Sequence, residues 1–483
     1  MSHPQALFKK TDKLSLLLFF LTWMVIKTVR MLPLIFCFRL GEALGLLTYA
    51  LIPYYRYLAH KNFSIAFGET HSLRERKTLV RRHFRTLGAN ILSSIKIPAL
   101  SEASLREVLT IEDETMFQEV IDCDHRPGVV VALSHFGNWE MNAQIATFLR
   151  LRRAGAIYQK LRNKALNKLV NEARNRGVIT FDRKRDLTAA ATFLREGGLV
   201  GVLIDQHAGD SGIWIPFFHK LASTSPLAAT LAQKTGALLI HATIHTVGPA
   251  RWLLRFNAPT PTENRTVAEI TYNLGCQLSE KIKDSPADWF WVHNRWKLPS
   301  PAFLLQRVKR GFYVPKDIIL HPFKLLVRSP NWLGDACMAA PAVCSLKKGR
   351  PDVHLTILAP QKLAALWNSF SEIDEVIEIP PKASPWLVAR QLREKCYYEG
   401  QPPFEAALLL PNSIRSALEV WLAKIPRRIG RTENKGILRK WLINQPFPKM
   451  ATDSPTHQAD EYRSVAYWLG ASPFSQKKGD ELK

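Results

Sequence analysis

Cysteine is scarce in this sequence. The chain has 483 residues and six cysteines, which lie at Cys37, Cys123, Cys276, Cys337, Cys344 and Cys396. They form no CxxC pair and no tight cluster, so the sequence excludes a disulfide-stapled scaffold and offers no cysteine-based metal site. We expect reduced thiols in a protein that faces the cytosol and binds no metal.

The sequence also lacks internal repeats, low-complexity tracts and enough acidic residues to balance its basic ones. It has 41 Asp and Glu against 66 Lys and Arg, a formal net charge of +25. A surplus of this size favours anionic membranes, acidic carrier proteins, phosphorylated substrates or nucleic acid as partners. With 47% hydrophobic and 22% charged residues the chain is globular, and its length predicts two domains.

The first apolar run near the N-terminus is too short to cross a bilayer as one helix. Residues 14–26 would rise only about 20 Å as a helix, against a hydrocarbon core of roughly 30 Å. Lys27 and Arg30 follow before residues 31–38 resume the apolar pattern, and no small-residue cleavage site for a signal peptide is present. The pattern predicts an embedded or interfacial anchor over residues 1–45 on the cytoplasmic face of the membrane. A single tilted span and a buried helical hairpin of a soluble domain are the alternatives.

Beyond residue 45, short apolar runs alternate with helical patterns in two separate stretches. The runs are 128–133, 198–205, 237–246 and 252–259 in the first stretch, and 323–330, 354–360, 375–380 and 404–411 in the second. The first stretch predicts an α/β sheet in a domain spanning residues 46–305. A basic, proline-marked linker is expected at 306–322. The second stretch, 323–483, predicts a parallel, Rossmann-like sheet of its own.

The segment Gly128–Arg150 joins a buried-strand pattern to a helical pattern through a polar stretch that contains His135 and Glu140. On one continuous helix these two residues would be about 140° out of phase. A turn removes the difficulty, because Gly137 permits a tight bend and Asn138 is a good helix N-cap, which puts Glu140 in the first helical turn. The carboxylate could then hold one tautomer of the imidazole, so that His135 acts as a general base toward a hydroxyl. The alternative is a capped helix whose glutamate only complements the helix dipole.

Other polar residues are candidates for substrate contacts. Asp205 and Gln206 end the strand pattern at 198–205, where side chains often line a site, although they could instead brace the next loop. His293, Arg295 and Lys297 form a basic group that suits a phosphorylated head group, or a solvated face.

In the second stretch, residues 325–352 run from a strand pattern through a glycine-bearing loop into a helical pattern. Gly334 would let backbone amides approach a ligand, and Asp335 at the helix start could serve as a base for a sugar hydroxyl. A plain N-cap role for Asp335 fits the spacing equally well.

Four blocks of the first stretch resemble, in order, those of the lysophospholipid-type acyltransferases, and in particular the late acyltransferases of lipid A biosynthesis. They are HKNFSIAFGE (60–69), LSHFGNWE (133–140), LIDQHAGDSGIWIPFFHKLAST (203–224) and DWFWVHNRWK (288–297). The resemblance covers about residues 13 to 300. It implies a glycerolipid acyltransferase-like α/β domain with an N-terminal apolar helix.

The chemistry implied by this resemblance is acyl transfer at the cytoplasmic face of the inner membrane. His135 would deprotonate a hydroxyl of a lipid A precursor, Glu140 would orient His135, and the hydroxyl would attack the thioester of an acyl carrier protein. No covalent acyl-enzyme, cofactor or metal is required, and no nucleic-acid partner is expected. Asn138, Asp205, Gln206 and the basic group of residues 293–297 would bind substrate. The family commonly has an arginine after a tyrosine where this chain has Gln159 after Tyr158, and Lys160 or Arg162 would take its place.

The second stretch resembles the N-terminal, acceptor-side half of the lipopolysaccharide heptosyltransferases, which are GT-B glycosyltransferases. Residues 325–352, 408–431 and 457–470 carry this resemblance. Such enzymes bind the nucleotide-sugar donor mostly in a following Rossmann-like domain, which this sequence does not match. The half would then be a vestige, a docking surface for the growing glycolipid, or one part of a split enzyme. The alternatives for the whole chain are acyl transfer to another phospholipid or glycolipid, and a glycosyltransferase or scaffold that the first domain only anchors.

Overall fold

Two β-sheets organise the chain, one in each of two units. The computed structural model describes residues 13–115, 128–148, 153–158, 178–396, 402–433, 436–448 and 457–472. The first unit comprises Met1–Phe63, His71–Ala208 and Thr224–Arg295. The second comprises Ser64–Thr70, Gly209–Ser223 and Trp296–Lys483. The chain therefore crosses between the units more than once.

The first unit is built on a seven-stranded sheet with strand order β1-β9-β8-β2-β5-β3-β4. The strands are β1 Leu109–Ile111, β2 Val129–Leu133, β3 Ala154–Tyr158, β4 Ile179–Asp182, β5 Leu199–Leu203, β8 Leu238–Gly248 and β9 Arg251–Phe256. All neighbouring strands are parallel except β8 and β9. The central strands β2 and β5 read VVVAL and LVGVL because helices cover both of their faces. The predicted α/β sheet is confirmed.

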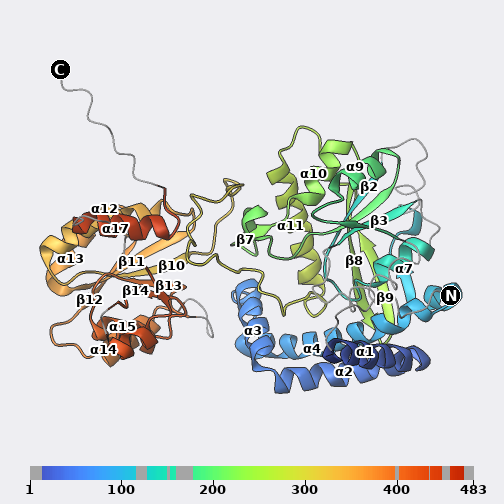
Figure 1. Ribbon diagram of the computed structural model, residues 1–483, viewed down its shortest axis with the longest axis horizontal. Coiled ribbons are helices and arrows are strands. Elements are labelled where there is room, and N and C mark those ends of the chain that lie inside the picture. The colour runs from blue at the N-terminus through green and yellow to red at the C-terminus, as the bar shows by residue number, and fades with distance from the viewer. Residues whose placement is uncertain are drawn as a thin grey trace. The chain divides into compact units, whose positions relative to one another are not determined.

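Helices cover the two faces of this sheet separately (Figure 1). One face packs on α9 Leu187–Arg195, α10 Leu227–Thr235 and α11 Val267–Asp284. The other packs on α5 Glu102–Val108, α7 Met141–Phe148 and residues of the N-terminal helices. The carboxyl ends of the central strands, where β2 leads toward α7, are left for the loops that carry the polar motif of Gly128–Arg150.

Four N-terminal helices form a layer of the first unit (Figure 1). They are α1 Lys13–Met31, α2 Leu34–Leu51, α3 Pro53–Phe67 and α4 Leu73–Lys96, and the short 3-10 helix η2 Ile97–Ala99 follows. Pro33 separates α1 from α2, because its ring cannot continue a helix. Ser72 and Glu75 form a capping box that starts α4. The predicted domain boundary between residues 45 and 46 falls inside α2.

Helix α2 meets α4 backbone to backbone. A Cβ on Gly45 would lie 2.0 Å from the carbonyl oxygen of Phe84, and one on Gly88 would lie 2.2 Å from that of Gly41. Among the described residues, α2 is the one helix long and apolar enough to cross a membrane, with 22% of it buried in the protein. Its partner α4 exposes Arg74, Lys77, Arg81, Arg82 and Arg85 along its first half.

The second unit contains a six-stranded parallel sheet with strand order β12-β11-β10-β13-β14-β15, which is the Rossmann order. The strands are β10 Phe323–Arg328, β11 Val353–Pro360, β12 Glu375–Ile379, β13 Ala406–Leu409, β14 Arg428–Gly430 and β15 Gln445–Pro446. The predicted Rossmann-like sheet, and the four strands expected in it, are confirmed.

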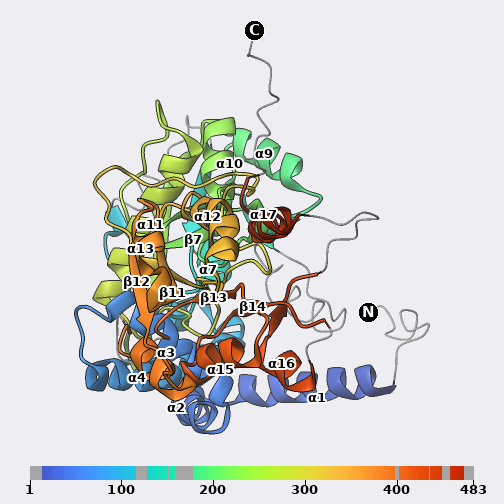
Figure 2. The ribbon, with the colours of Figure 1, turned by 90° about the vertical axis from the view of Figure 1, so that its left-hand side faces the viewer.

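Helices lie on both sides of this second sheet (Figure 2). On one side are α12 Leu333–Lys347 and α17 Gln458–Trp468, and on the other are α14 Pro385–Arg393, α15 Ile414–Leu422 and α16 Gly436–Leu442. The short η4 Gln361–Leu363 and α13 Ala364–Asn368 follow β11.

The segment expected to be a linker, 306–322, packs on a hairpin of the second unit. The hairpin consists of β6 Ile213–Phe217 and β7 Lys220–Thr224, after the short η3 Gly209–Ser211. Trp214 and Leu221 pack with Leu305, Val308 and Val314. The backbone N–H of Tyr313 also donates to the carbonyl of Trp214 at 2.8 Å. The segment is therefore part of a small apolar cluster.

The contact between α2 and α4 predicts that Gly45 tolerates no larger side chain. Gly45→Val should push the helices apart and lower the free energy of unfolding of the first unit by about 1–3 kcal/mol. Gly248→Ala is the matched control, because its methyl group would meet Arg251 only at 3.7 Å. The measurement is the thermal unfolding midpoint followed by tryptophan fluorescence. A Gly45→Val midpoint equal to that of Gly248→Ala would mean that the helices do not touch.

Candidate active site

Two strands that pair in register bring His135 and Asp205 together. β2 and β5 are parallel neighbours with Leu133 opposite Leu203. His135 and Asp205 each follow these paired residues by two positions. Because parallel strands end at the same edge of a sheet, side chains just beyond the carboxyl ends of neighbours meet there. The position of Asp205 at a strand end is confirmed, and the pairing with His135 is new.

The loop after β2 turns at Gly137, as predicted. Gly137 has φ of 53°, and a Cβ there would lie 1.8 Å from the carbonyl oxygen of Ile244, so no other residue fits. The prediction that Asn138 caps the helix is wrong. Its side-chain amide is buried and has no hydrogen-bond partner among the described residues, and α7 begins only at Met141.

The carboxylate of Asp205 accepts three hydrogen bonds. The imidazole Nδ1 of His135 lies 2.8 Å from Oδ1, and the backbone N–H of His135 donates to Oδ2 at 2.8 Å. The indole N–H of Trp289 donates to Oδ2 at 2.9 Å. Asp205 is fully buried, whereas the His135 side chain retains some exposure. Asp205 therefore fixes the Nδ1 side of the His135 ring, while part of the His135 side chain stays exposed.

These contacts set the protonation of the pair. Burial alone would raise the pKa of Asp205, but the neighbouring His135 and its hydrogen bonds, with a smaller contribution from His293, hold this pKa well below its usual range. An ionised Asp205 accepts the Nδ1 proton of His135 and leaves Nε2 as the acceptor. The side-chain nitrogen of Gln206 lies 3.3 Å from that Nε2. Gln206 therefore stands where a substrate hydroxyl would approach.

Glu140 is the residue expected to orient His135, but the structure puts Asp205 on the ring nitrogen Nδ1. Glu140 directly precedes α7, and one of its carboxylate oxygens accepts the indole N–H of Trp139 at 3.2 Å. The reason is the strand register, which delivers Asp205 to the back of the imidazole from a neighbouring strand.

Aromatic rings surround the imidazole. The centroids of Trp139 and Phe290 lie 5.3 and 5.8 Å from that of His135. Phe290 stacks on His293, and His293 Nδ1 lies 2.6 Å from the Phe290 carbonyl oxygen. Burial lowers the pKa of His293 to about 4, although Asp205 opposes the shift, so His293 is neutral at pH 7.

A cavity of about 610 Å³ opens beside His135. The polar lining residues His135, Glu140, Gln206 and His207 gather beyond the carboxyl ends of β2 and β5, at what we call the mouth, and the rest of the lining is mostly apolar. The floor is the sheet face under α7, where Ala156 on β3 pairs with Gly201 on β5. These small side chains leave a groove that runs along the strands away from the mouth, toward Ala154, Val178 and Leu199. The shape and lining suit an unbranched hydrocarbon chain.

Trp289 and Asn62, which the sequence patterns did not mark as site residues, hold the segments of the site in place. Trp289 supplies the third hydrogen bond to Asp205. Asn62, on α3, is buried, and its amide nitrogen donates to the carbonyl oxygens of Trp291 and His293 at 2.7 and 2.8 Å. Both belong to blocks that carry the resemblance, 60–69 and 288–297, and that membership was the available signal for them.

The predicted basic group does not present three exposed cations together. His293 is largely buried and neutral, Arg295 is buried with its guanidinium donating to Thr224 Oγ1, and the exposed Lys297 belongs to the second unit. Lys160 and Arg162 lie outside the described residues. No group of three or more His, Cys, Asp or Glu residues that could hold a metal ion occurs in the described part of the chain.

In the second unit, Gly334 and Asp335 lie in the first turn of α12. The N-cap is Trp332, so the alternative that Asp335 is a plain N-cap is wrong. Apart from its chain neighbours and its own helix backbone, no heavy atom of the described residues lies within 4 Å of the position of a Cβ on Gly334, so this side of the helix is open to approach. A role for this pair in sugar binding stays a prediction.

Comparison with known proteins gives two kinds of relatives. A family model described as "Bacterial lipid A biosynthesis acyltransferase" matches residues 7–298. The phosphatidylinositol mannoside acyltransferase of Mycolicibacterium smegmatis is 23% identical over 225 residues, which cover 45% of this chain and 72% of that protein.

The other relatives are heptosyltransferases. Lipopolysaccharide heptosyltransferase 2 of Salmonella typhimurium is 32% identical over 153 residues, which cover 30% of this chain and 41% of that protein. A solved structure of the ADP-heptose lipopolysaccharide heptosyltransferase II of E. coli is 28% identical, with a TM-score of 0.26, over 30% of this chain and 41% of that one. The chain thus spans about two fifths of the length of the heptosyltransferases that it matches.

A buried carboxyl next to the site has an unusual pKa. Burial raises the pKa of Asp288 from 3.8 to about 6, although the backbone N–H of Thr246 donates to its Oδ2 at 3.0 Å. The other oxygen, Oδ1, has no hydrogen-bond partner among the described residues. The folded state therefore binds this proton more tightly than the unfolded chain. The resulting stabilisation is present below about pH 4 and is lost as the pH rises through about 6.

Asp288→Asn should therefore raise the free energy of unfolding at pH 8, by on the order of 1–3 kcal/mol, and change it little at pH 4. The amide oxygen can keep the hydrogen bond from Thr246, while the buried charge is removed. Variant and wild type are compared at each pH by chemical denaturation, since His83 and His241, whose pKa values burial lowers to about 4, destabilise both proteins in acid. If the substitution raised the free energy of unfolding equally at pH 4 and pH 8, the raised pKa of Asp288 would be contradicted.

Proposed function

The chain belongs to the bacterial lipid A biosynthesis acyltransferase family, and on that basis we propose that it transfers an acyl chain from a thioester to a hydroxyl of a lipid A precursor. The observation that carries the proposal is the placement of His135. Asp205 contacts the Nδ1 atom of His135, and the other side of the imidazole faces the mouth of an apolar cavity. A base beside a lipid-sized cavity fits acyl transfer to an alcohol.

The reaction follows from this geometry. His135 Nε2 takes the proton of the acceptor hydroxyl while the oxygen attacks the thioester carbonyl carbon. The carbon–sulfur bond then breaks, and the departing sulfur takes the proton back from the imidazolium. Asp205 compensates the positive charge that His135 carries between these steps. The chain supplies no nucleophile in this scheme, so the acyl group passes directly from donor to acceptor.

We assign the positioning of His135 to Asp205 and a place at the cavity mouth to Glu140. Asp205 contacts both the ring and the backbone of His135, so it controls the tautomer and the orientation together. Glu140 lines the mouth with Trp139. There its carboxylate would contact the acceptor or the donor. Mutation separates the two roles.

The acyl chain fits the groove under α7. Its floor of small residues, Ala154, Ala156 and Gly201, leaves room for methylene groups, each of which gains about 0.8 kcal/mol when it leaves water. The donor that suits the net charge of +25 is an acidic acyl carrier protein, because opposite charges speed encounter.

The N-terminal helices would lie in the interface of the inner membrane at its cytoplasmic face. Exposed apolar residues run along α1 and α2 to the start of α3, among them Phe36, Leu47, Leu51 and Tyr54. A helix that spanned the bilayer would bring α4, packed against it through glycines, into hydrocarbon together with its exposed arginines, at several kcal/mol per charge. An interfacial position avoids this cost.

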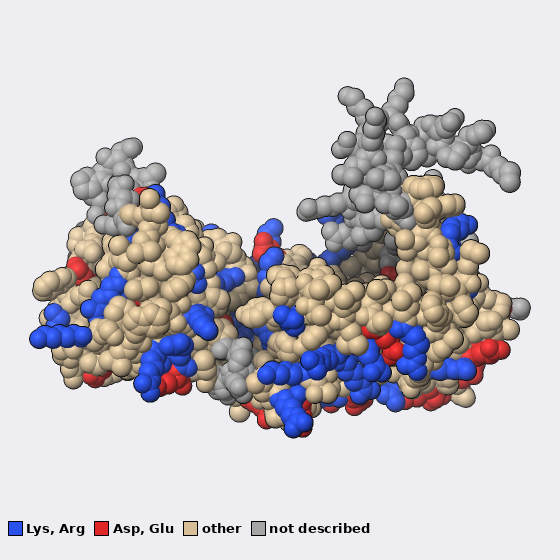
Figure 3. All heavy atoms as spheres, turned by 90° about the horizontal axis from the view of Figure 1, so that it is seen from below, with Lys and Arg blue, Asp and Glu red and all other residues tan. Residues whose placement is uncertain are grey.

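The charge distribution supports the same position. Figure 3 looks onto the side of α1–α4, where Lys and Arg gather in a band beside a broad area that carries other residues. Arg56 and Arg81 lie over the ring of Tyr49, at 5.6 and 5.8 Å from its centroid. Aromatic rings and arginines that lie together on these helices suit the boundary between lipid tails and anionic head groups.

The alternative acceptor is another membrane glycolipid or phospholipid. The mycobacterial relative is a phosphatidylinositol mannoside acyltransferase, so related chains differ in acceptor. Mass spectrometry of lipids from cells with and without the gene distinguishes the acceptors. The heptosyltransferase relatives favour a second candidate function, in which the Rossmann unit takes part in glycosyl transfer to the same lipid.

The catalytic assignment predicts that His135→Ala and Asp205→Asn each lower kcat by about 10²–10⁴-fold. The first removes the base, and the second puts an amide N–H against N–H donors and so misplaces the ring. Glu140→Gln should have the smaller effect. The assay supplies purified protein with labelled acyl carrier protein and a tetra-acylated lipid A precursor, and Glu280→Gln, an exposed carboxyl on α11, is the control.

The thermal midpoint of each variant shows whether it is folded. Wild-type activity in folded His135→Ala would defeat the mechanism. A folded Asp205→Asn that keeps its activity, beside an inactive Glu140→Gln, would return the positioning role to Glu140.

The interfacial position predicts that the double substitution Leu47→Glu and Leu51→Glu weakens membrane binding. Two charges on the exposed face of α2 would have to enter the apolar part of the interface, which should cost at least tenfold in partition. The measurement is the fraction of protein that sediments with membranes after a high-salt wash. Ile179→Glu is the control, since Ile179 is similarly exposed on β4. Full retention of the double variant would place the anchor elsewhere.

A further inference from the structure

Large apolar side chains are exposed at one edge of the Rossmann sheet. They are Trp332, Leu333, Trp386, Leu387, Ile414, Ile437 and Leu438. Trp332 is 70% exposed, Trp386 65% and Ile437 88%. A tryptophan in water forgoes one of the largest burial energies of any side chain, so exposure at several neighbouring loops calls for an explanation.

All seven residues lie where a helix begins after a parallel strand. Trp332 and Leu333 start α12 after β10, and Trp386 and Leu387 start α14 after β12. Ile414 starts α15 after β13, and Ile437 and Leu438 start α16 after β14. Since the strands are parallel, these four helix starts share the carboxyl edge of the sheet. We call these seven residues the edge surface.

Cations stand among the apolar side chains. Lys362, in η4 after β11, lies over the ring of Trp332 with its ammonium 4.8 Å from the centroid. Lys382 precedes α14, Arg415 follows Ile414, and Lys440 lies on α16; all three are exposed. Lysines therefore stand on or next to three of the four helix starts, and Arg415 at the fourth is ion-paired with Glu419.

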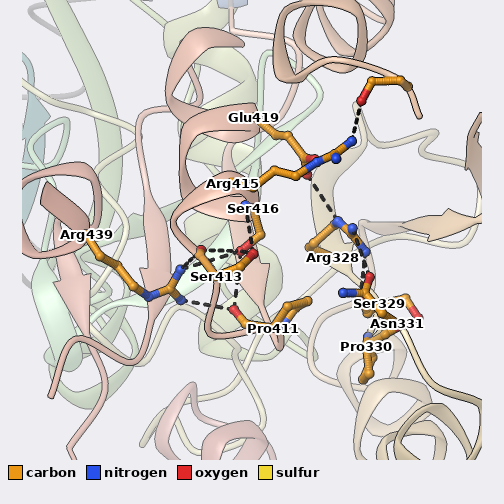
Figure 4. Close-up of polar contacts among 11 residues, drawn as sticks. Arg328, Ser329, Pro330, Asn331, Pro411, Ser413, Arg415, Ser416, Glu419 and Arg439 are labelled. Carbon is orange, nitrogen blue, oxygen red and sulfur yellow. Dashed lines mark hydrogen bonds and ion pairs between the residues drawn. The ribbon is translucent and has the colours of Figure 1, made fainter. Parts of the chain in front are cut away.

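Buried arginines hold two of these loops in place (Figure 4). Arg328, at the end of β10, pairs with Glu419 at 3.1 Å and donates to the Ser329 carbonyl at 2.7 Å and to Asn331 Oδ1 at 3.2 Å. These bonds fix the loop that presents Trp332. Because Glu419 is on α15, the loop after β10 is tied to the helix after β13.

The remaining loops are tied in the same way. Arg439, on α16, is buried and donates to the carbonyls of Pro411, Ser413 and Arg431. Arg415 pairs with Glu419 and donates to the carbonyl of Ala383, before α14. These contacts tie the starts of α12, α14, α15 and α16 to one another, so the backbone that presents the apolar side chains is held in place.

Two exposed aromatic side chains elsewhere in the described part of this unit have aromatic or cationic partners. The rings of Trp441 and Trp421 pack at a tilt of 48°, with their centroids 5.1 Å apart. Tyr467 lies under the guanidinium of Arg307, which is 4.1 Å from its ring centroid. Tyr467 is near the opposite edge of the sheet, where the backbones of Leu469 and Gly349 bond to Leu304 and Leu305.

We propose that the edge surface docks on the surface of a membrane that contains anionic lipids. Tryptophan rings sit favourably at the level of the head groups, leucine and isoleucine reach the first methylenes, and lysine and arginine meet phosphate groups. A protein partner would also fit the apolar side chains, but lysines beside three of the four helix starts match a surface of negative charge. The proposal does not depend on acyl transfer, and it concerns a surface separate from the N-terminal helices.

Hydrogen exchange of the full-length protein, followed by mass spectrometry, tests this surface directly. The probes are vesicles of phosphatidylglycerol with phosphatidylethanolamine, and vesicles of phosphatidylcholine alone. We expect slower exchange in peptides spanning 330–334, 384–388, 413–416 and 436–439 with the anionic vesicles, in addition to the N-terminal helices. Protection limited to the N-terminal helices overturns the proposal.

Two variants give the energetic test. The double variant Trp332→Ser and Trp386→Ser should bind the anionic vesicles about tenfold more weakly, since it removes two interfacial aromatic anchors. Tyr467→Ser, at the opposite edge, should bind like the wild type. Equal binding by all three proteins overturns the proposal, provided that the variants have the wild-type unfolding midpoint.

Three further outcomes would also count against it. If vesicles of phosphatidylcholine alone slowed hydrogen exchange as much as the anionic vesicles do, the cations would have no role in docking. Protection that grows with protein concentration in the absence of lipid would assign the edge surface to a second copy of the chain. Protection caused by an added protein and not by vesicles would assign it to a protein partner. None of these outcomes bears on His135, so the proposed acyl transfer stands or falls separately.

Discussion

The site depends on one buried carboxylate. Asp205 accepts hydrogen bonds from the ring and backbone of His135 and from the indole of Trp289, which come from two segments far apart in sequence. A charge so deeply buried is tolerable only because every bond is made, and each lost donor would leave part of it unpaired. The turn at Gly137 and the amide of Asn62, which pins the segment of Trp291 and His293, keep these donors in place. The position of His135 at the cavity mouth therefore depends on packing well outside the cavity.

The two units share a way of making a site. In each, parallel strands end at one edge, and the loops that follow carry the exposed or reactive side chains. In the first unit this edge holds His135, Asp205 and Gln206 above an apolar cavity. In the second, it holds tryptophans and cations on loops that Arg328 and Arg439 brace. Buried polar contacts fix the loops in both units, and solvent-facing groups then act from a rigid base.

Much of the fold could be predicted from residue patterns. The apolar runs at 128–133 and 198–205 became β2 and β5, and the four runs after residue 323 became β10 to β13. Short strands such as β4, β14 and β15 were not predicted, because two to four residues carry too little periodicity. His135 was singled out because a cluster of polar residues directly after a buried strand is unusual. The role of Asp205 on the His135 ring was not found, because the partner strand of β2 is not encoded in local sequence.

The sequence by itself determined most of the elements, namely which longer segments form strands and helices and where glycine permits a turn. It also determined that the chain as a whole is basic and that its N-terminal segment is apolar. These properties depend on neighbouring residues and on composition. The tertiary structure alone decided which carboxylate contacts His135, that small residues on β3 and β5 face a cavity, and that exposed tryptophans of separate loops share one edge. Such choices follow from strand order and register. These result from the packing of the whole sheet, in which residues 70 positions apart become neighbours because their strands end side by side.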